Sequence, residues 1–250
     1  MRAVSRALLA VRYLTIVPIS SLAHADLAEL GAAAGWFPVI GGALGVVLAA
    51  VDTVTTRAFP PLLAALLTLT VWKLLTGGLH LDGFADCLDG LAGRDPEQRR
   101  AIMRDSRIGA FGVIGLILFL MLELGAISEL AHGVRWRALV AAPAVARAAP
   151  ALIGGLFRSA RVEGQGAAFS AGLRPASVVV GLVLAVIIAA AALGALGVVA
   201  SIVAVGGAVA LAAFFARRLA GVTGDVFGAG VEVAELLFLL TLVAWTRASA

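Results

Sequence analysis

Three aspartates at helical spacing follow a long apolar stretch in the segment TGGLHLDGFADCLDGLAG, residues 76–93. In a helix, Asp82, Asp86 and Asp89 fall within roughly 60° of one face, because each residue adds about 100° of rotation. Carboxylates that close repel one another unless a cation lies among them. Hard oxygen donors, without a cluster of Cys and His ligands, favour Mg²⁺ or Mn²⁺ over zinc. The segment therefore predicts a metal site for phosphate chemistry. The alternative is a solvated loop whose acids pair with nearby arginines.

A second motif, RDSRIGAFG at residues 104–112, opens a later apolar stretch. Asp105 is a further candidate catalytic acid that can complete a metal shell. Arg104 and Arg107 are candidate substrate-binding residues, because planar guanidinium groups suit diphosphate oxygens. The start of a helix also presents unpaired N–H groups to an anion, and Gly109 keeps that end open. The alternative is that a serine caps the helix and the arginines only orient the span.

A third acidic set lies in GVTGDVFGAGVEVAELL, residues 221–237. Asp225, Glu232 and Glu235 can share one helix face, with Glu232 about 10 Å deeper than Asp225 at 1.5 Å per residue. Intramembrane carboxylates bind ligands, pair with an arginine or accept protons. We interpret Asp225 as a substrate-binding residue. For Glu232, a role at the site and pairing with Arg147 both stay open.

Two other residues are candidates for chemistry. His80 is a candidate general base, since a neutral imidazole titrates near working pH. On a continuous helix it would point away from Asp86 and Asp89, so this role needs a break, which Gly83 can supply. Lys73 lies in the middle of an apolar stretch, where it would snorkel, pair with an acid or line a cavity.

The composition indicates an integral membrane protein. The chain has 250 residues, of which 62% are hydrophobic and 14% charged, against about 45–50% and 25% in soluble domains. Its single cysteine, Cys87, excludes an internal disulfide. The net charge of +4 does not indicate nucleic-acid binding, because the arginines cluster in loops beside apolar spans. The N-terminal segment is too interrupted by Arg12 for a signal peptide and is expected to lie in the membrane plane.

The apolar stretches predict an all-α fold: one polytopic membrane helical bundle of about seven transmembrane helices, in a single domain over residues 1–250. Residues 175–216 carry no charge and are twice as long as one span needs, so they must fold back near residues 194–197. The expected spans are residues 30–51, 60–79, 108–130, 138–157, two within 175–216, and 226–245.

The arginines set the expected orientation. With the N-terminus inside, thirteen arginines lie in inner loops and four in outer loops, so the N-terminus is expected in the cytoplasm. The inner set is Arg2, Arg6, Arg12, Arg94, Arg99, Arg100, Arg104, Arg107, Arg158, Arg161, Arg174, Arg217 and Arg218. The outer set is Arg57, Arg135, Arg137 and Arg247. The motif aspartates then all lie at the cytoplasmic ends of spans.

These motifs together resemble one known family. GGLHLDGFADCLDG, IMRDSRIGAFG and TGDVFGAGVEVAEL, with YLTIVPI, GWFPVIGGALG and RVEGQG, are similar to cobalamin synthase, the adenosylcobinamide-GDP ribazoletransferase family, over nearly the whole chain. The resemblance implies that α-ribazole or its 5′-phosphate is joined to adenosylcobinamide-GDP, with release of GMP and a requirement for Mg²⁺. It implies metal and catalytic roles for the motif acids Asp82, Asp86, Asp89, Asp105 and Asp225. It also implies a bacterial inner-membrane location with the site on the cytoplasmic face.

Other functions stay open from the residues alone. A membrane transferase that joins a nucleotide-activated alcohol to a lipid also uses spaced aspartates, although its usual motif has a longer gap. A transporter would use the intramembrane charges as an ion pathway: Lys73, Arg147, Glu123, Glu232 and Glu235. Against this, the acids lie mostly at one face and no internal repeat is visible. A purely structural subunit would leave the acids without a purpose. The sequence leaves the oligomeric state open, with a homo-oligomer among the alternatives.

Overall fold

The computed structural model describes residues 2–19 and 28–248 and is built from helices. These are α1 (Arg2–Leu14), α2 (Ala28–Ala33), the 3-10 turn η2 (Ala34–Trp36), α3 (Phe37–Ala58), α4 (Pro61–Leu75), α5 (Leu79–Gly90), α6 (Pro96–Ile102), α7 (Ala110–Glu129), α8 (His132–Ala146), α9 (Ala149–Leu156), α10 (Gln165–Gly172), α11 (Pro175–Leu193), α12 (Ala195–Leu219) and α13 (Gly224–Ala248). Within the described residues the only β pairing is an isolated bridge. The all-α prediction is confirmed.

Six helical segments of the described chain are long and apolar enough to cross a membrane, and α4 with α5 makes a seventh if the bent pair is one span. The expected bundle of about seven spans is therefore confirmed. The second expected span, residues 60–79, is not one continuous helix, because the chain turns by 89° between α4 and α5. Gly77 and Gly78 make this bend at φ angles of +63° and +67°, a region that favours glycine.

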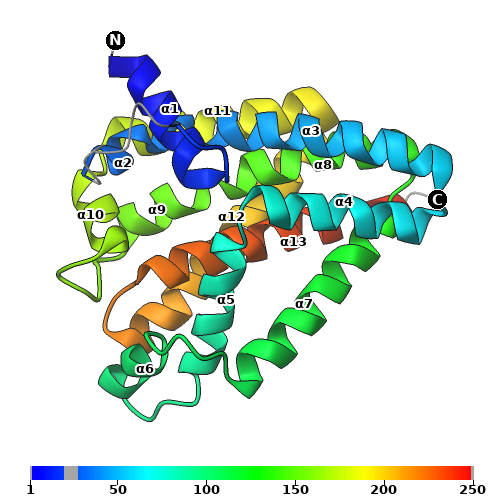
Figure 1. The fold of residues 1–250 in the computed structure, drawn as a ribbon. Helices are drawn as coiled ribbons and strands as arrows, with labels where there is room; N and C mark the ends of the chain where they lie inside the picture. The colour runs from blue at the N-terminus through cyan, green and yellow to red at the C-terminus, as the bar shows by residue number, and fades with distance from the viewer. Residues whose placement is uncertain (1, 20–27, 249–250) are drawn as a thin grey trace.

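The bundle has two ends. Figure 1 shows the α3–α4 turn, the start of α8 and the C-terminal end of α13 at one end, and α6 and α10 toward the opposite end. Between these ends α13 runs through the middle of the bundle, and most of its residues are buried. The predicted turn between the fifth and sixth spans falls at Gly194. Helix α1 buries Leu9, Ala10 and Leu14 against the bundle.

Small residues let α3 and α8 pack closely. A Cβ atom at Gly45 would lie 2.5 Å from the carbonyl oxygen of Leu139, and one at Gly41 would overlap the carbonyl of Pro143. Close approach of backbones through small residues is a common way for helices to associate in membranes, where the solvent is as apolar as the side chains. Helices α3 and α8 are therefore closely packed along these glycines.

We expect Gly45→Ala to destabilise the protein by about 1–3 kcal/mol, because the new methyl group must push two helices apart. Gly206 in α12 is the matched control, since a Cβ atom there meets nothing within 4 Å. Gly206→Ala should be neutral or stabilise by up to about 1 kcal/mol, through helix propensity alone. Unfolding in detergent measures both variants, and equal effects would contradict the packing described for α3 and α8.

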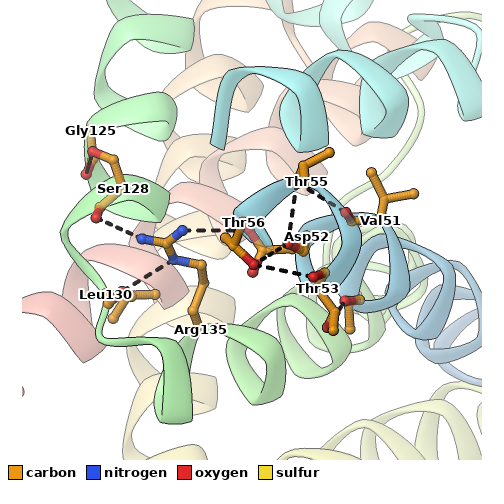
Figure 2. A network of polar contacts seen from close by, with 10 residues as sticks. Val51, Asp52, Thr53, Thr55, Thr56, Gly125, Ser128, Leu130 and Arg135 are labelled. Atoms are coloured by element: carbon orange, nitrogen blue, oxygen red, sulfur yellow. Dashed lines mark hydrogen bonds and ion pairs between the residues drawn. The ribbon is translucent and has the colours of Figure 1, made fainter. Parts of the chain in front are cut away.

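A buried ion pair fixes the end of the bundle that is far from α6. Arg135 of α8 lies 3.5 Å from Asp52 of α3 and donates hydrogen bonds to the carbonyl oxygens of Ser128 and Leu130, at the end of α7 (Figure 2). Both charged side chains are almost fully buried. Arg135 was expected in an outer loop; it lies instead in the first turn of α8, where it satisfies the free carbonyls that end α7.

Candidate active site

Helix α5 crosses the start of α13 at two glycines, and this crossing positions the acidic motifs. A Cβ atom at Gly83 would lie 2.8 Å from the carbonyl oxygen of Asp225, and one at Gly228 would lie 3.2 Å from the backbone of His80. Only glycine at these positions allows so close an approach. The crossing therefore joins residues that are almost 150 positions apart in the sequence. Gly83 is a contact point and not the break that we expected, since α5 continues through it.

The loop after α9 completes this corner of the bundle. Residues Ser159 and Val222 form the parallel bridge, with the Ala160 N–H donating to the Val222 oxygen at 2.8 Å. This pairing holds Arg161 beside α13, where its Nη2 donates to Asp225 Oδ2 at 3.3 Å. The Thr223 hydroxyl donates to the same oxygen at 3.1 Å. Asp225 is thus fixed by two partners from two segments.

A cavity of about 170 Å³ opens at this corner. Asp82, Asp225, Arg161 and His80 all line it, together with aromatic side chains from α1, α3, α10 and α13. His80 is 5% exposed, and its Nδ1 has no hydrogen-bond partner among the described residues. Burial and, to a lesser extent, the charge of Asp225 raise the pKa of Tyr13, which also lines the cavity. The cavity therefore combines carboxylates, a cation, an imidazole and a neutral phenol.

Asp86 lies half-buried beside this acidic group. It interacts electrostatically with Asp82, Asp225 and Asp89, in decreasing order, and with the cation Arg161. Of the three aspartates that we expected to act together, Asp82 lines the cavity with Asp225, and Asp86 lies close enough to both to interact with them electrostatically. Several carboxylates share a single arginine here, so the group carries excess negative charge, and it repels itself unless a further cation binds.

Asp89 points elsewhere and caps the start of α7. Its two carboxylate oxygens accept hydrogen bonds from the backbone N–H groups of Gly109, at 2.7 Å, and Gly112, at 2.8 Å. A carboxylate at a helix N-terminus satisfies free N–H groups and interacts favourably with the helix dipole. A Cβ atom at Gly112 would lie 2.5 Å from this carboxylate. The motifs at residues 76–93 and 104–112 thus meet through Asp89.

Gly112→Ala should displace the Asp89 carboxylate and cost about 1–2 kcal/mol of stability, the value of a helix cap. Gly125→Ala on the same helix is the control, because a Cβ atom there meets nothing within 4 Å. Thermal denaturation in detergent compares the two. A Gly112→Ala protein as stable as Gly125→Ala would show that the cap does not hold α7.

Asp105 and Arg107 form an exposed pair near the start of α7. Arg107 donates to both Asp105 oxygens, at 3.1 and 2.8 Å, and these hydrogen bonds lower the pKa of Asp105 to about 2. Both residues line a second, open hollow with Asp89 and Gly109. Arg104 is exposed and lines neither hollow. The structure therefore places Asp105, Arg107 and Gly109 in a hollow distinct from the one that contains Asp82 and Asp225.

Glu232 belongs to a buried charge cluster deeper in the bundle. Lys73 Nζ lies 2.7 Å from Glu232, 3.0 Å from Glu123 and 3.1 Å from Glu235, and Arg147 pairs with Glu235. The three carboxylates are the only His, Cys, Asp or Glu group in the described part of the chain that is compact enough for a metal ion. The Lys73 ammonium already contacts all three. Glu232 therefore pairs with Lys73, whereas Arg147, its expected partner, pairs with Glu235.

Sequence reasoning missed two contributors to the cavity, Arg161 and Thr223. The sequence presents Arg161 only as an inner-loop charge, although it is the first residue of the family segment RVEGQG. Its partner Asp225 lies 64 positions away, and only the bridge between the two loops shows that they meet. Thr223 precedes a recognised aspartate by two residues, a spacing typical of local side-chain hydrogen bonds. That signal was readable in the sequence.

The fold and site define a polytopic helical membrane protein with an acidic cavity near one end of its bundle. The family model described as cobalamin-5-phosphate synthase matches residues 6–243. An adenosylcobinamide-GDP ribazoletransferase of Geotalea daltonii is 37% identical over 236 residues, 94% of this chain and 95% of the relative. Another from Brevibacillus brevis is 36% identical over 94% of this chain and 96% of the relative. One from Escherichia coli O17:K52:H18 is 41% identical over 83% of this chain and 85% of the relative. No solved structure matches.

This chain therefore belongs to the cobalamin-5-phosphate synthase family. The match spans nearly the whole chain, and it includes the three acidic motifs on which the resemblance rested. The resemblance is confirmed.

Proposed function

We propose that this protein joins α-ribazole, or its 5′-phosphate, to adenosylcobinamide-GDP, releasing GMP and forming adenosylcobalamin or its 5′-phosphate. The relatives' names support the substrates and the transfer. The observation that carries the proposal is the cavity at the α5–α13 crossing, where Asp82 and Asp225 lie together with Arg161. Carboxylates and a guanidinium group are the parts that a phosphoryl-transfer site needs, since this chemistry rests on positioning and charge.

The donor chemistry at the crossing suits Mg²⁺, although the carboxylate oxygens there do not all lie within 4.8 Å of one another in this structure. Asp82, Asp86 and Asp225 offer hard oxygen donors, and Arg161 alone does not balance their charge. These three aspartates would hold the ion, with Asp225 in the place that the sequence assigned to Asp89. When bound, Mg²⁺ neutralises diphosphate oxygens and polarises the phosphorus. Asp89 would support the site from its position as the cap of α7.

The protein's residues would do the remaining work. In the reaction a bond forms between a ribose hydroxyl oxygen and the phosphorus on the corrinoid's aminopropanol arm, while the phosphorus–oxygen bond to GMP breaks. The hydroxyl proton would pass to His80, whose Nδ1 has no hydrogen-bond partner among the described residues. This role needs no break in α5, because His80 lines the cavity with Asp82 and Asp225. Arg161 would bind a phosphate oxygen once a substrate competes for its contact with Asp225.

The second hollow would bind the end of adenosylcobinamide-GDP that lies outside the first cavity. Arg107 lies there, and its guanidinium group favours an anion, whereas the N–H groups at the start of α7 are already bound by Asp89. Arg104, exposed in the same loop, would add positive charge near this hollow. With the N-terminus in the cytoplasm, both hollows would lie at the cytoplasmic face of the bacterial inner membrane, within reach of a corrinoid resting on the bilayer.

Product analysis tests this proposal. Purified protein in lipid nanodiscs is incubated with adenosylcobinamide-GDP, α-ribazole and Mg²⁺, and the products are resolved by mass spectrometry. We expect equal amounts of GMP and adenosylcobalamin, and no reaction when either substrate is omitted or when Mg²⁺ is chelated. Turnover of a nucleotide-activated lipid alcohol in place of the corrinoid would contradict the proposal.

A further inference from the structure

One wall of the cavity at the α5–α13 crossing is aromatic. Tyr13, Phe37, Phe169 and Phe227 all line it, and they come from α1, α3, α10 and α13 in turn. Phe37, Phe169 and Phe227 are almost fully buried, so at this wall the cavity meets the edge of the apolar core. The wall therefore calls for a ligand with an apolar, flat face.

The rings are arranged as a nearly parallel row. The Tyr13 and Phe37 centroids are 6.0 Å apart at 19°, and the Phe37 and Phe169 centroids are 5.9 Å apart at 17°. Phe227 meets Phe169 edge-on at 5.4 Å. Offset-parallel and edge-on contacts are the favoured geometries between aromatic rings. A planar heterocycle can join such a row through the same contacts.

The size and polarity of the cavity select among the flat groups in the reaction. A corrin ring is too large for about 170 Å³. Guanine and adenine carry several hydrogen-bonding groups on their edges, which phenyl side chains cannot satisfy. The dimethylbenzimidazole base of α-ribazole is flat, largely apolar and small, so it fits this wall best.

The cavity also contains the carboxylates that the ribose of the nucleoside must approach. Asp82 and Asp225 line it together with the rings, and Tyr13 lies close enough to Asp225 to interact with it electrostatically. A base stacked on the aromatic wall would direct its ribose toward these carboxylates, where the attacking hydroxyl is needed. The diphosphate substrate would then approach from the side of Asp86 and the second hollow.

We propose that the wall formed by Tyr13, Phe37, Phe169 and Phe227 is the subsite that binds the base of the incoming nucleoside, and that it selects a flat apolar heterocycle. This inference rests on the proposed function for the identity of the nucleoside. In this proposal adenosylcobinamide-GDP binds on the side of Asp86 and the second hollow, away from this wall.

A pair of adjacent alanines in α10 provides the test. Ala167 lines the cavity and Ala168 does not, although both are half-buried. Ala167→Leu should fill part of the cavity, whereas Ala168→Leu adds the same atoms outside it. We expect Ala167→Leu to raise the KM for α-ribazole by at least about tenfold, the scale of one lost base-stacking contact, with the KM for adenosylcobinamide-GDP within twofold of wild type. Ala168→Leu should change neither.

Two further measurements separate binding from turnover. Calorimetry of α-ribazole with the wild-type protein and both variants should show the same tenfold loss for Ala167→Leu alone. The riboside of unmethylated benzimidazole, a smaller base, should lose less affinity in Ala167→Leu than α-ribazole does. Binding of α-ribazole without turnover would contradict only the proposed reaction. Unchanged α-ribazole affinity in Ala167→Leu, or a rise in the KM for adenosylcobinamide-GDP instead, would overturn the subsite.

Discussion

Asp82→Asn and Asp225→Asn should each lower turnover on the order of 10³-fold, the scale seen when one preorganised electrostatic contact to a transition state is lost. Each change keeps the size of the side chain and removes a charge that would hold Mg²⁺. The two residues lie on α5 and α13 and line one cavity. Their effects should therefore be far from additive, because both act on the same bound group. Steady-state release of GMP measures the losses.

Asp95→Asn is the matched control for these two variants. Asp95 caps α6 through hydrogen bonds to the N–H groups of Glu97 and Gln98, and asparagine caps a helix about as well as aspartate does. This control should keep wild-type turnover and stability. Full activity in Asp82→Asn and Asp225→Asn, with the wild-type fold, would remove both residues from the mechanism.

Lys73→Met should be the most destabilising single change in the bundle interior, at about 3–5 kcal/mol, because it leaves buried charges without their partner. Lys73 contacts Glu123, Glu232 and Glu235, and at most 2% of any of these three side chains is exposed. Denaturant titration in mixed micelles measures the loss. Stability close to wild type would show that Lys73 is not the charged partner of these carboxylates.

Two controls sharpen this prediction. The exposed pair of Arg247 and Glu129 is worth less than about 1 kcal/mol in a typical protein, so Arg247→Met should have little effect. Within the cluster, three carboxylates face the two cations Lys73 and Arg147. Neutralising one carboxylate by Glu123→Gln should therefore be better tolerated than Lys73→Met.

The sequence predicted the helical class, the approximate number of spans and the turn at Gly194, because each rests on hydropathy and length. It also identified Asp82 and Asp225, the two aspartates that line the cavity. It did not predict the bend at Gly77 and Gly78, since apolar residues continue through that point and hydropathy carries no information on backbone angles. The expected break was placed instead at Gly83, a glycine that serves contact between helices.

The roles of individual acids needed tertiary structure. The spacing in the sequence predicts one helix face for Asp82, Asp86 and Asp89. In the structure Asp89 instead caps α7, because Gly109 and Gly112 leave room for its carboxylate. The cluster of Lys73 with three glutamates joins residues up to 162 positions apart. Such groupings depend on how helices cross, and a single sequence does not specify these crossings.

Binding of Mn²⁺ to the purified protein, followed by electron paramagnetic resonance, tests most directly whether the α5–α13 crossing is the metal-dependent centre. Mn²⁺ takes the same oxygen ligands as Mg²⁺ and can be observed without turnover. We expect saturable binding by the wild-type protein and Asp95→Asn, and at least about tenfold weaker binding by Asp82→Asn and Asp225→Asn. Equal Mn²⁺ affinity in all four proteins would contradict the account.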